Sequence, residues 1–360
     1  MSPLEEGIAM ENKQNISQQH SDGRVFETLN ADQIAKRLKE YTNVPGVRLP
    51  RDIDFVIIND VLKVFIYKPT QNMQTDSASF EGWILALKSW LSNEIRFVDL
   101  DFSVPDSLSG RYGNPKVGHY NRFLYRINNL LRLFPDWFSL DKSKVIIVSD
   151  FMHWLESNTT LLNHSLKERE SVIQTNNMER QVESWLVFEE GKDLLCNFWA
   201  IDKNKLFNQL PIGVFYKEIA AKNAIFTRGA SAVDLWGIGN DEKTLHLFEL
   251  KCGVNKGMGV ISETLFYTAI IYDTCISKED LFQFGRYRGT PDTRDSLAIE
   301  NKGEKFERLF VHILSEKYHP LFNEQVVLLI KEGLSNLNIN FDRATYDYNI
   351  KVIFDEANDL

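Results

Sequence analysis

The stretch ASAVDLWGIGNDEKTLHLFELKC, residues 230–252, contains two apolar runs separated by residues that favour a tight turn. Runs rich in Val, Leu, Ile and aromatic residues on either side of such a turn predict two strands that pair side by side. The first strand carries Asp234, and the second carries Glu249 and Lys251. Because side chains alternate across a strand, Glu249 and Lys251 should point the same way, into an apolar surface.

Charged side chains on an inward strand face cost several kcal/mol unless they are paired or hold a metal ion. One lysine between two carboxylates leaves excess negative charge, which a hard cation such as Mg²⁺ neutralises through oxygen ligands. Such a cation polarises a phosphoryl oxygen and lowers the pKa of a bound water, as phosphodiester hydrolysis requires. The pattern therefore indicates Asp234, Glu249 and Lys251 as catalytic residues. The alternative is a buried ion pair in an inert α/β domain.

The flanking segments predict the order helix, several strands, helix, strand. Residues 178–191 have apolar side chains at helical spacing and end at a glycine. The expected strands are 196–201, 211–219, 230–238 and 244–252, followed by a long apolar helix at 259–276, a strand at 307–314, a helix at 321–333 and a strand at 348–356.

This arrangement resembles the PD-(D/E)XK nuclease superfamily, which has the restriction-endonuclease-like fold, through Asp234 and the triplet Glu249, Leu250, Lys251. The resemblance implies a mixed central sheet flanked by helices. It also implies that Asp234, Glu249 and the Leu250 backbone carbonyl bind Mg²⁺, for which Mn²⁺ could substitute. Lys251 would position the attacking water and stabilise charge on the phosphate, as a catalytic base or as a charge stabiliser. Val233 occupies the position at which the family has its proline. The resemblance therefore depends on the order of elements around the motif, which is strand, turn, strand and helix.

Two accessory features also look like family features. Glu183, together with Glu179, lies on the opening helix, where many members keep a carboxylate close to the metal; a solvated helix face is the alternative. Glu263 and Tyr267 are four residues apart on the later helix, hence on one face. They resemble the QxxxY pair of some branches, with Glu in place of Gln.

Basic residues that could contact nucleic acid are few in this half of the chain. Lys256 lies in the glycine-rich turn 252–259, close enough to the motif to touch a phosphate. Arg286, Arg288 and Arg294 form a basic cluster with a tyrosine, which could grip a nucleic-acid backbone. An ordinary polar loop is the alternative interpretation of this cluster.

The first half of the chain predicts a smaller α/β domain at residues 23–155, after a disordered tail at 1–22. A polar stretch at 156–177 is the expected linker to a nuclease domain at 178–360. The smaller domain should contain helices at 31–41, 79–91 and 120–133, a hairpin at 54–68 and strands at 96–104 and 144–150. Its expected role is recognition or regulation.

Composition sets limits on the function. The net charge is −9, and residues 176–360 hold 21 Lys and Arg against 28 Asp and Glu, which argues against non-specific attraction to nucleic acid. The three cysteines have long spacings, which fit neither a disulfide framework nor a zinc site and indicate a reducing cytoplasm. No apolar run is long enough to span a membrane.

We therefore expect a Mg²⁺-dependent nuclease, acting on DNA in restriction, phage defence or DNA processing. The alternative is a non-catalytic interaction protein that retains the fold. The sequence leaves formation of a homo-oligomer open.

Overall fold

The computed structural model describes residues 28–44, 47–72, 78–105, 112–163, 177–226, 231–253, 257–285 and 305–355. The described chain is a mixed α/β structure, as predicted. The predicted tail, residues 1–22, lies outside the described residues.

The motif hairpin lies inside a six-stranded mixed sheet. Its strands are β8 (Ala232–Gly239) and β9 (Thr244–Lys251), which pair antiparallel as predicted. Asp241 fixes the turn, because its Oδ1 accepts hydrogen bonds from the backbone N–H groups of Lys243 and Thr244, both at 2.9 Å. The sheet order is β13-β12-β11-β9-β8-β6. The remaining strands are β6 (Ile201–Pro211), β11 (Arg308–Ser315), β12 (Ile339–Asp347) and β13 (Val352–Asp355).

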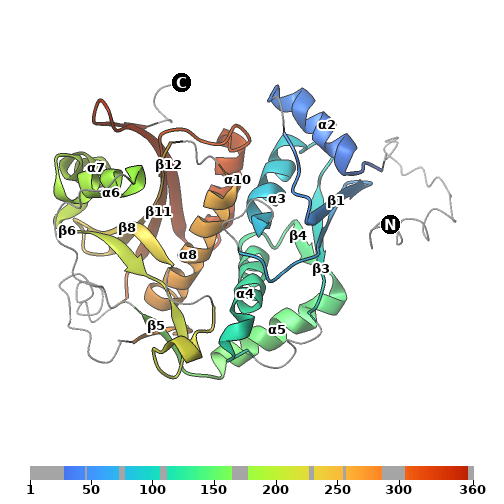
Figure 1. The fold of residues 1–360 in the computed structure, drawn as a ribbon, viewed down its shortest axis with the longest axis horizontal. Coiled ribbons are helices and arrows are strands. Elements are labelled where there is room, and N and C mark those ends of the chain that lie inside the picture. Colours follow the sequence, from blue (N-terminus) through green and yellow to red (C-terminus); the bar gives the residue numbers. More distant parts are fainter. Residues whose placement is uncertain are drawn as a thin grey trace.

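Helices cover both faces of this sheet (Figure 1). On one face lie α6 (Met178–Phe188) and α7 (Gly191–Trp199), whose apolar side chains form a core with β6, β8, β9 and β11. On the other face lie α8 (Gly259–Cys275) and α10 (Glu324–Ser335). Strand β11 follows α8 and runs parallel to β9. The sequence order is therefore helix, antiparallel strands, helix and parallel strand.

The first part of the chain forms a four-stranded sheet of order β1-β2-β3-β4. The first two strands are a hairpin and the last three run parallel, so helices connect them. The strands are β1 (Ile53–Ile58), β2 (Val61–Ile66), β3 (Phe97–Phe102) and β4 (Phe138–Leu140). The helices are α2 (Ala31–Thr42), α3 (Phe80–Trp90), α4 (Gly118–Leu133) and α5 (Lys142–Glu156).

Two predicted strands are wrong. Residues 144–150 belong to α5, where the Asp141 side chain caps the helix and Val148, Phe151 and Leu155 are buried at helical spacing. The exposed β-branched residues Val145 and Ile146 gave this segment its strand-like composition. Residues 196–199 likewise end α7, and the strand begins only at Ile201.

A third, small sheet has the order β10-β5-β7 and joins the two halves of the chain. Its strands are β5 (Thr160–Asn163), β7 (Val214–Tyr216) and β10 (Gln283–Gly285). Strand β5 lies inside the predicted linker 156–177, of which residues 164–176 are outside the described part. Short 3₁₀ turns occur at Pro115–Val117 and Ala221–Asn223. Within the described ranges, no helix combines the length and apolar character needed to cross a membrane.

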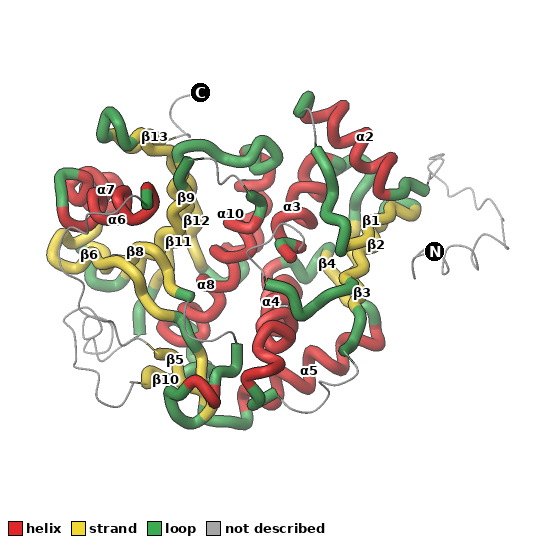
Figure 2. Tube along the Cα trace, viewed as in Figure 1, coloured by secondary structure: helices red, strands yellow, loops and turns green. Residues whose placement is uncertain are grey.

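The two large sheets lie on either side of a layer of helices. In Figures 1 and 2, α3 and α4 stand between the four-stranded sheet and α8 and α10. One continuous apolar core includes side chains from β1, β2 and β3, from all four helices and from the inner face of the six-stranded sheet. The approach is close at Gly82 of α3, where an added Cβ would lie 2.7 Å from the carbonyl oxygen of Met258. The first part of the chain therefore packs directly on the helix that follows the motif hairpin.

Two buried histidines lie on the face of the six-stranded sheet opposite the motif. Nδ1 of His246 on β9 lies 3.1 Å from Nε2 of His312 on β11. The rings of Phe248, Phe310 and Trp199 surround the pair. Burial lowers the pKa of His246 to about 4 and holds the pKa of His312 well below its ordinary value. Both imidazoles are therefore neutral at neutral pH.

This pair should make the protein sensitive to acid. In the unfolded chain each histidine titrates near 6.5. Below that pH the unfolded state therefore binds protons that the native state does not bind. The stabilisation that comes from keeping these histidines neutral is fully present above their pKa in the unfolded chain. It is lost as the pH falls towards their pKa in the folded protein. We expect the histidine pair to contribute a loss in the free energy of unfolding, measured with urea, as the pH falls from about 7 to about 5.

The double variant His246→Phe/His312→Phe lacks this contribution, so its free energy of unfolding should rise relative to that of the parent as the pH falls over the same window. His153→Phe, which changes an exposed histidine on α5, is the matched control and should behave like the parent. Equal slopes for the double variant and the parent would contradict this assignment.

Candidate active site

The strand register brings Asp234 and Glu249 together. Leu235 pairs with Phe248 and Trp236 with Leu247, so the same register places Asp234 directly opposite Glu249. Directly opposed residues in an antiparallel pair project from the same face. That face is the one covered by α8, because Trp236 and Leu247 belong to the apolar core that includes α8. The Oδ2 atom of Asp234 also accepts a hydrogen bond from the backbone N–H of Leu250, at 2.8 Å.

Lys251 lies beside this pair, as the strand alternation predicted. Its Nζ is 2.7 Å from Oε1 of Glu249 and 3.1 Å from Oε2 of Glu263 on α8. All three side chains are largely buried, with Lys251 14% exposed and the two glutamates 6% and 7% exposed. One ammonium group therefore faces two buried carboxylates, with a third carboxylate on the neighbouring strand.

The electrostatics of the cluster reflect its burial and its excess negative charge. Burial raises the pKa of Asp234 to about 7, against the opposing effects of Lys251 and the Leu250 N–H group. Burial, followed by the charge of Asp234, raises the pKa of Glu249 well above its ordinary value. Burial alone would lower the pKa of Lys251, but the surrounding carboxylates outweigh it and raise that pKa. The lysine is therefore a permanent ammonium ion.

The chemistry of the carboxylates can be compared with what a cation requires. Among the described residues, the buried Oε2 atom of Glu249 has no hydrogen-bond partner, which is costly for a carboxylate oxygen. Carboxylate oxygens such as those of Asp234 and Glu249 are the ligands that Mg²⁺ prefers, usually with several waters and substrate oxygens completing its shell. In the described part of the chain, no three His, Cys, Asp or Glu side chains form a group that could hold a metal ion. The carboxylates of Asp234 and Glu249 are therefore the chemically suitable donors at this site.

The predicted accessory carboxylates of α6 lie near Asp234. Both Glu179 and Glu183 act to raise its pKa by their charge. Glu183 is buried, not on a solvated face, and it accepts hydrogen bonds from Asn208 Nδ2 at 2.5 Å and from Gln209 Nε2 at 3.1 Å. The two amides come from β6, and no pattern in the sequence predicts them, because only the folded arrangement shows that they meet α6.

Helix α8 brings Glu263 and Tyr267 to the same cluster. Glu263 pairs with Lys251, as given above. Tyr267 is buried, and its pKa is raised well above the ordinary value by burial and then by the charges of Glu249, Glu263 and Asp234. The pair that resembled QxxxY thus borders the motif residues.

A contact from β12 fixes the end of the motif strand. The Tyr346 hydroxyl donates to the carbonyl oxygen of Lys251 at 3.1 Å and lies 2.8 Å from Cys252 Sγ. Sequence reasoning missed this tyrosine, which lies in a strand with no motif of its own. The proposed nucleic-acid contacts Lys256, Arg286, Arg288 and Arg294 lie outside the described residues.

No protein-family model matches this chain, and no curated protein matches it by sequence.

Proposed function

We propose that the protein is a Mg²⁺-dependent nuclease that hydrolyses phosphodiester bonds of DNA. The observation that carries the proposal is the arrangement of Asp234, Glu249 and Lys251. Two carboxylates share one sheet face, a buried carboxylate oxygen has no partner among the described residues, and an ammonium group lies 2.7 Å from the same glutamate. This combination of charges is costly to bury unless it binds a cation or an anionic substrate.

The geometry suggests a role for each residue. Asp234, Glu249 and the backbone carbonyl of Leu250 would hold the Mg²⁺, with Glu183 close enough to act on its waters. The bound cation supplies a Lewis acid and lowers the pKa of a water molecule. Because its pKa is raised, Lys251 keeps its proton and would stabilise negative charge on the phosphate.

The topology also supports the proposal. The order of helices α6 and α7, antiparallel strands β6, β8 and β9, helix α8 and the parallel strand β11 resembles the order helix, motif-bearing meander, helix and strand that the PD-(D/E)XK resemblance implies. Asp234 on β8 and Glu249 and Lys251 on β9 lie within that meander. Restriction, phage defence and DNA processing are the roles that this family resemblance suggests.

Cleavage assays test the proposal. The full-length protein should cut single- or double-stranded DNA in the presence of Mg²⁺ or Mn²⁺. Removal of the metal with EDTA should stop cleavage, and added Mg²⁺ should restore it, because the carboxylates alone cannot activate a water molecule. RNA substrates in parallel decide which nucleic acid is cut.

A matched pair of variants provides the control. Asp234→Asn should weaken Mn²⁺ binding, whereas Glu242→Gln, which alters an exposed carboxylate at the turn of the same hairpin, should leave it unchanged. The enzyme proposal fails if no nucleic acid is cut with either metal and Asp234→Asn binds Mn²⁺ as the parent does. The fold would then serve a non-catalytic interaction.

A further inference from the structure

One turn of α8 connects the Lys251 cluster to the first part of the chain. Glu263 points to Lys251, with 3.1 Å between Oε2 and Nζ. The preceding residue, Ser262, is fully buried, and its hydroxyl donates to Oε2 of Glu81 on α3 at 2.7 Å. Successive side chains on a helix are about 100° apart, so one turn can contact two different layers. Any shift of this turn would change both contacts together.

The partner of Ser262 belongs to a buried ion pair. Nε of Arg126 on α4 donates to Oε1 of Glu81 at 2.6 Å, and Nη2 of Arg126 binds Oε2 of the same carboxylate. Glu81 is 1% exposed and Arg126 is 3% exposed. Nη2 of Arg126 also donates to the carbonyl oxygen of Ala78 at 2.8 Å, and the guanidinium lies 4.4 Å from the ring centroid of Phe80. The carboxylate that receives the Ser262 hydroxyl is therefore held rigidly.

Stability alone does not explain this pair. Desolvating two charges costs about as much as their attraction returns, so apolar residues in their place are often at least as stable. A bidentate pair does fix the geometry of the elements that carry it. The Glu81–Arg126 pair sets where α3 and α4 lie, and Ser262 transmits that position to α8.

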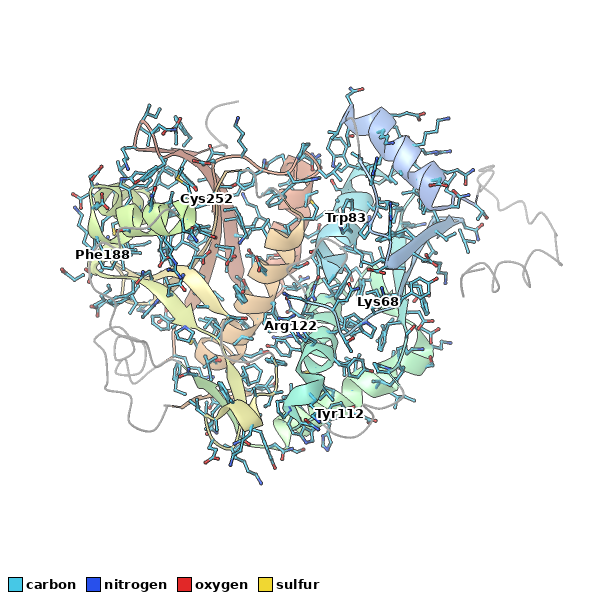
Figure 3. The ribbon with its side chains drawn as sticks, viewed as in Figure 1. Lys68, Trp83, Tyr112, Arg122, Phe188 and Cys252 are labelled. Carbon is cyan, nitrogen blue, oxygen red and sulfur yellow. The ribbon has the colours of Figure 1, made fainter. Side chains whose placement is uncertain are left out.

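Further contacts of α4 fix the position of α8 along its length. The Arg122 guanidinium lies 5.9 Å from the ring centroid of Phe266, and Figure 3 shows Arg122 where α4 runs beside α8. Arg132 binds both carboxylate oxygens of Asp273 at 3.0 Å, near the other end of α8. Tyr125 also donates to Asp273 and Asn129 donates to the carbonyl oxygen of Leu265, so residues 122, 125, 129 and 132 form one face of α4 that contacts α8.

We propose that Ser262, Glu81 and Arg126 are positioning residues for the Lys251 site. The buried pair holds α8 through Ser262, and α8 in turn holds Glu263 against Lys251. The first part of the chain is then a structural component of the catalytic centre. The role of these three residues in catalysis rests on the proposed function. Their energetic coupling to the Lys251 cluster does not.

A double-mutant cycle on the full-length chain tests the coupling. Ser262→Ala should raise the equilibrium constant for unfolding about tenfold, because it removes a hydrogen bond to a charged acceptor. In the Lys251→Met background, the factor by which Ser262→Ala raises this equilibrium constant should be about threefold smaller. The reason is that Glu263 then has no ammonium group at position 251 to bind. Urea unfolding of the four proteins gives these constants.

Thr274→Val is the matched control, since it also deletes one buried hydroxyl of α8, and that hydroxyl donates to the carbonyl oxygen of Ile270 in the same helix, at 2.7 Å. Its effect should be equal in both backgrounds, because Thr274 lies about 16 Å along the helix from Glu263. Equal effects of Ser262→Ala in both backgrounds would overturn the proposal. If Lys251→Met does not fold, Glu263→Gln replaces it as the second background and the same criteria apply.

Kinetics then separate the positioning role from the proposed function. Ser262→Ala should lower kcat about tenfold with little change in KM, as expected for loss of a group that orients a catalytic residue. Coupling in the cycle with kcat equal to that of the parent would overturn the positioning role in catalysis. If the parent cuts no nucleic acid, the proposed function fails, and the cycle alone decides whether Ser262 positions the Lys251 cluster.

Discussion

Replacing Lys251 with methionine is expected to slow phosphodiester cleavage about 10³-fold, the usual consequence of losing a group that stabilises transition-state charge. Methionine keeps the length of the side chain and much of its apolar contact, so the loss should be chemical. The physical reason is that Lys251 provides the positive charge that lies between Glu249 and Glu263, and its raised pKa keeps that charge present. Single-turnover cleavage in saturating Mg²⁺ measures the effect.

Lys243→Met is the matched control for this variant. Lys243 lies on the same hairpin, is 55% exposed and pairs with Glu307 at the surface. Its replacement should leave the cleavage rate within about twofold of the parent, because exposed pairs contribute little. Similar rates for Lys251→Met and Lys243→Met, with both proteins folded by circular dichroism, would remove Lys251 from the mechanism.

Replacing Arg126 with methionine should have the largest effect on stability, a loss of about 3–5 kcal/mol in the free energy of unfolding. The variant leaves the Glu81 carboxylate buried without its guanidinium partner, and that desolvated charge dominates the cost. The double variant Glu81→Met/Arg126→Met should recover most of the loss, since no uncompensated charge remains. Urea unfolding at neutral pH gives both values.

An exposed pair provides the comparison. Lys63 and Asp99 are 2.8 Å apart on β2 and β3, with side chains 38% and 28% exposed. Lys63→Met should cost less than about 1 kcal/mol, because water screens the pair. The assignment of a buried, uncompensated charge is wrong if Arg126→Met and Lys63→Met cost the same.

The motif hairpin could be predicted because its information is local. Alternating apolar residues, a turn centred on Asn240 and Asp241, and two charged residues on one strand face are all visible within 230–252. The long helix α8 was predictable for the same reason, since it is apolar over most of its length. Strand register then follows from the turn, which is why Asp234 falls opposite Glu249.

What could not be predicted depends on tertiary contacts. Residues 144–150 contain many β-branched residues, yet the Asp141 cap and the buried side chains of α5 make them helical. The amides that bind Glu183 come from β6, and the register of this strand cannot be predicted from its own sequence. The Glu81–Arg126–Ser262 contacts join residues up to 181 positions apart, and no pattern in one sequence marks such a meeting.

The close approach of α3 and α4 to α8 has a consequence for synthesis of the chain. Both early helices leave the ribosome before α8 does, and the roughly 130 residues between α4 and α8 take on the order of ten seconds to translate. During that interval the apolar faces that later cover α8 remain exposed to solvent or to a chaperone. Expression of the first part alone should therefore yield a fragment that aggregates. Coexpression of the rest of the chain should keep that fragment in solution.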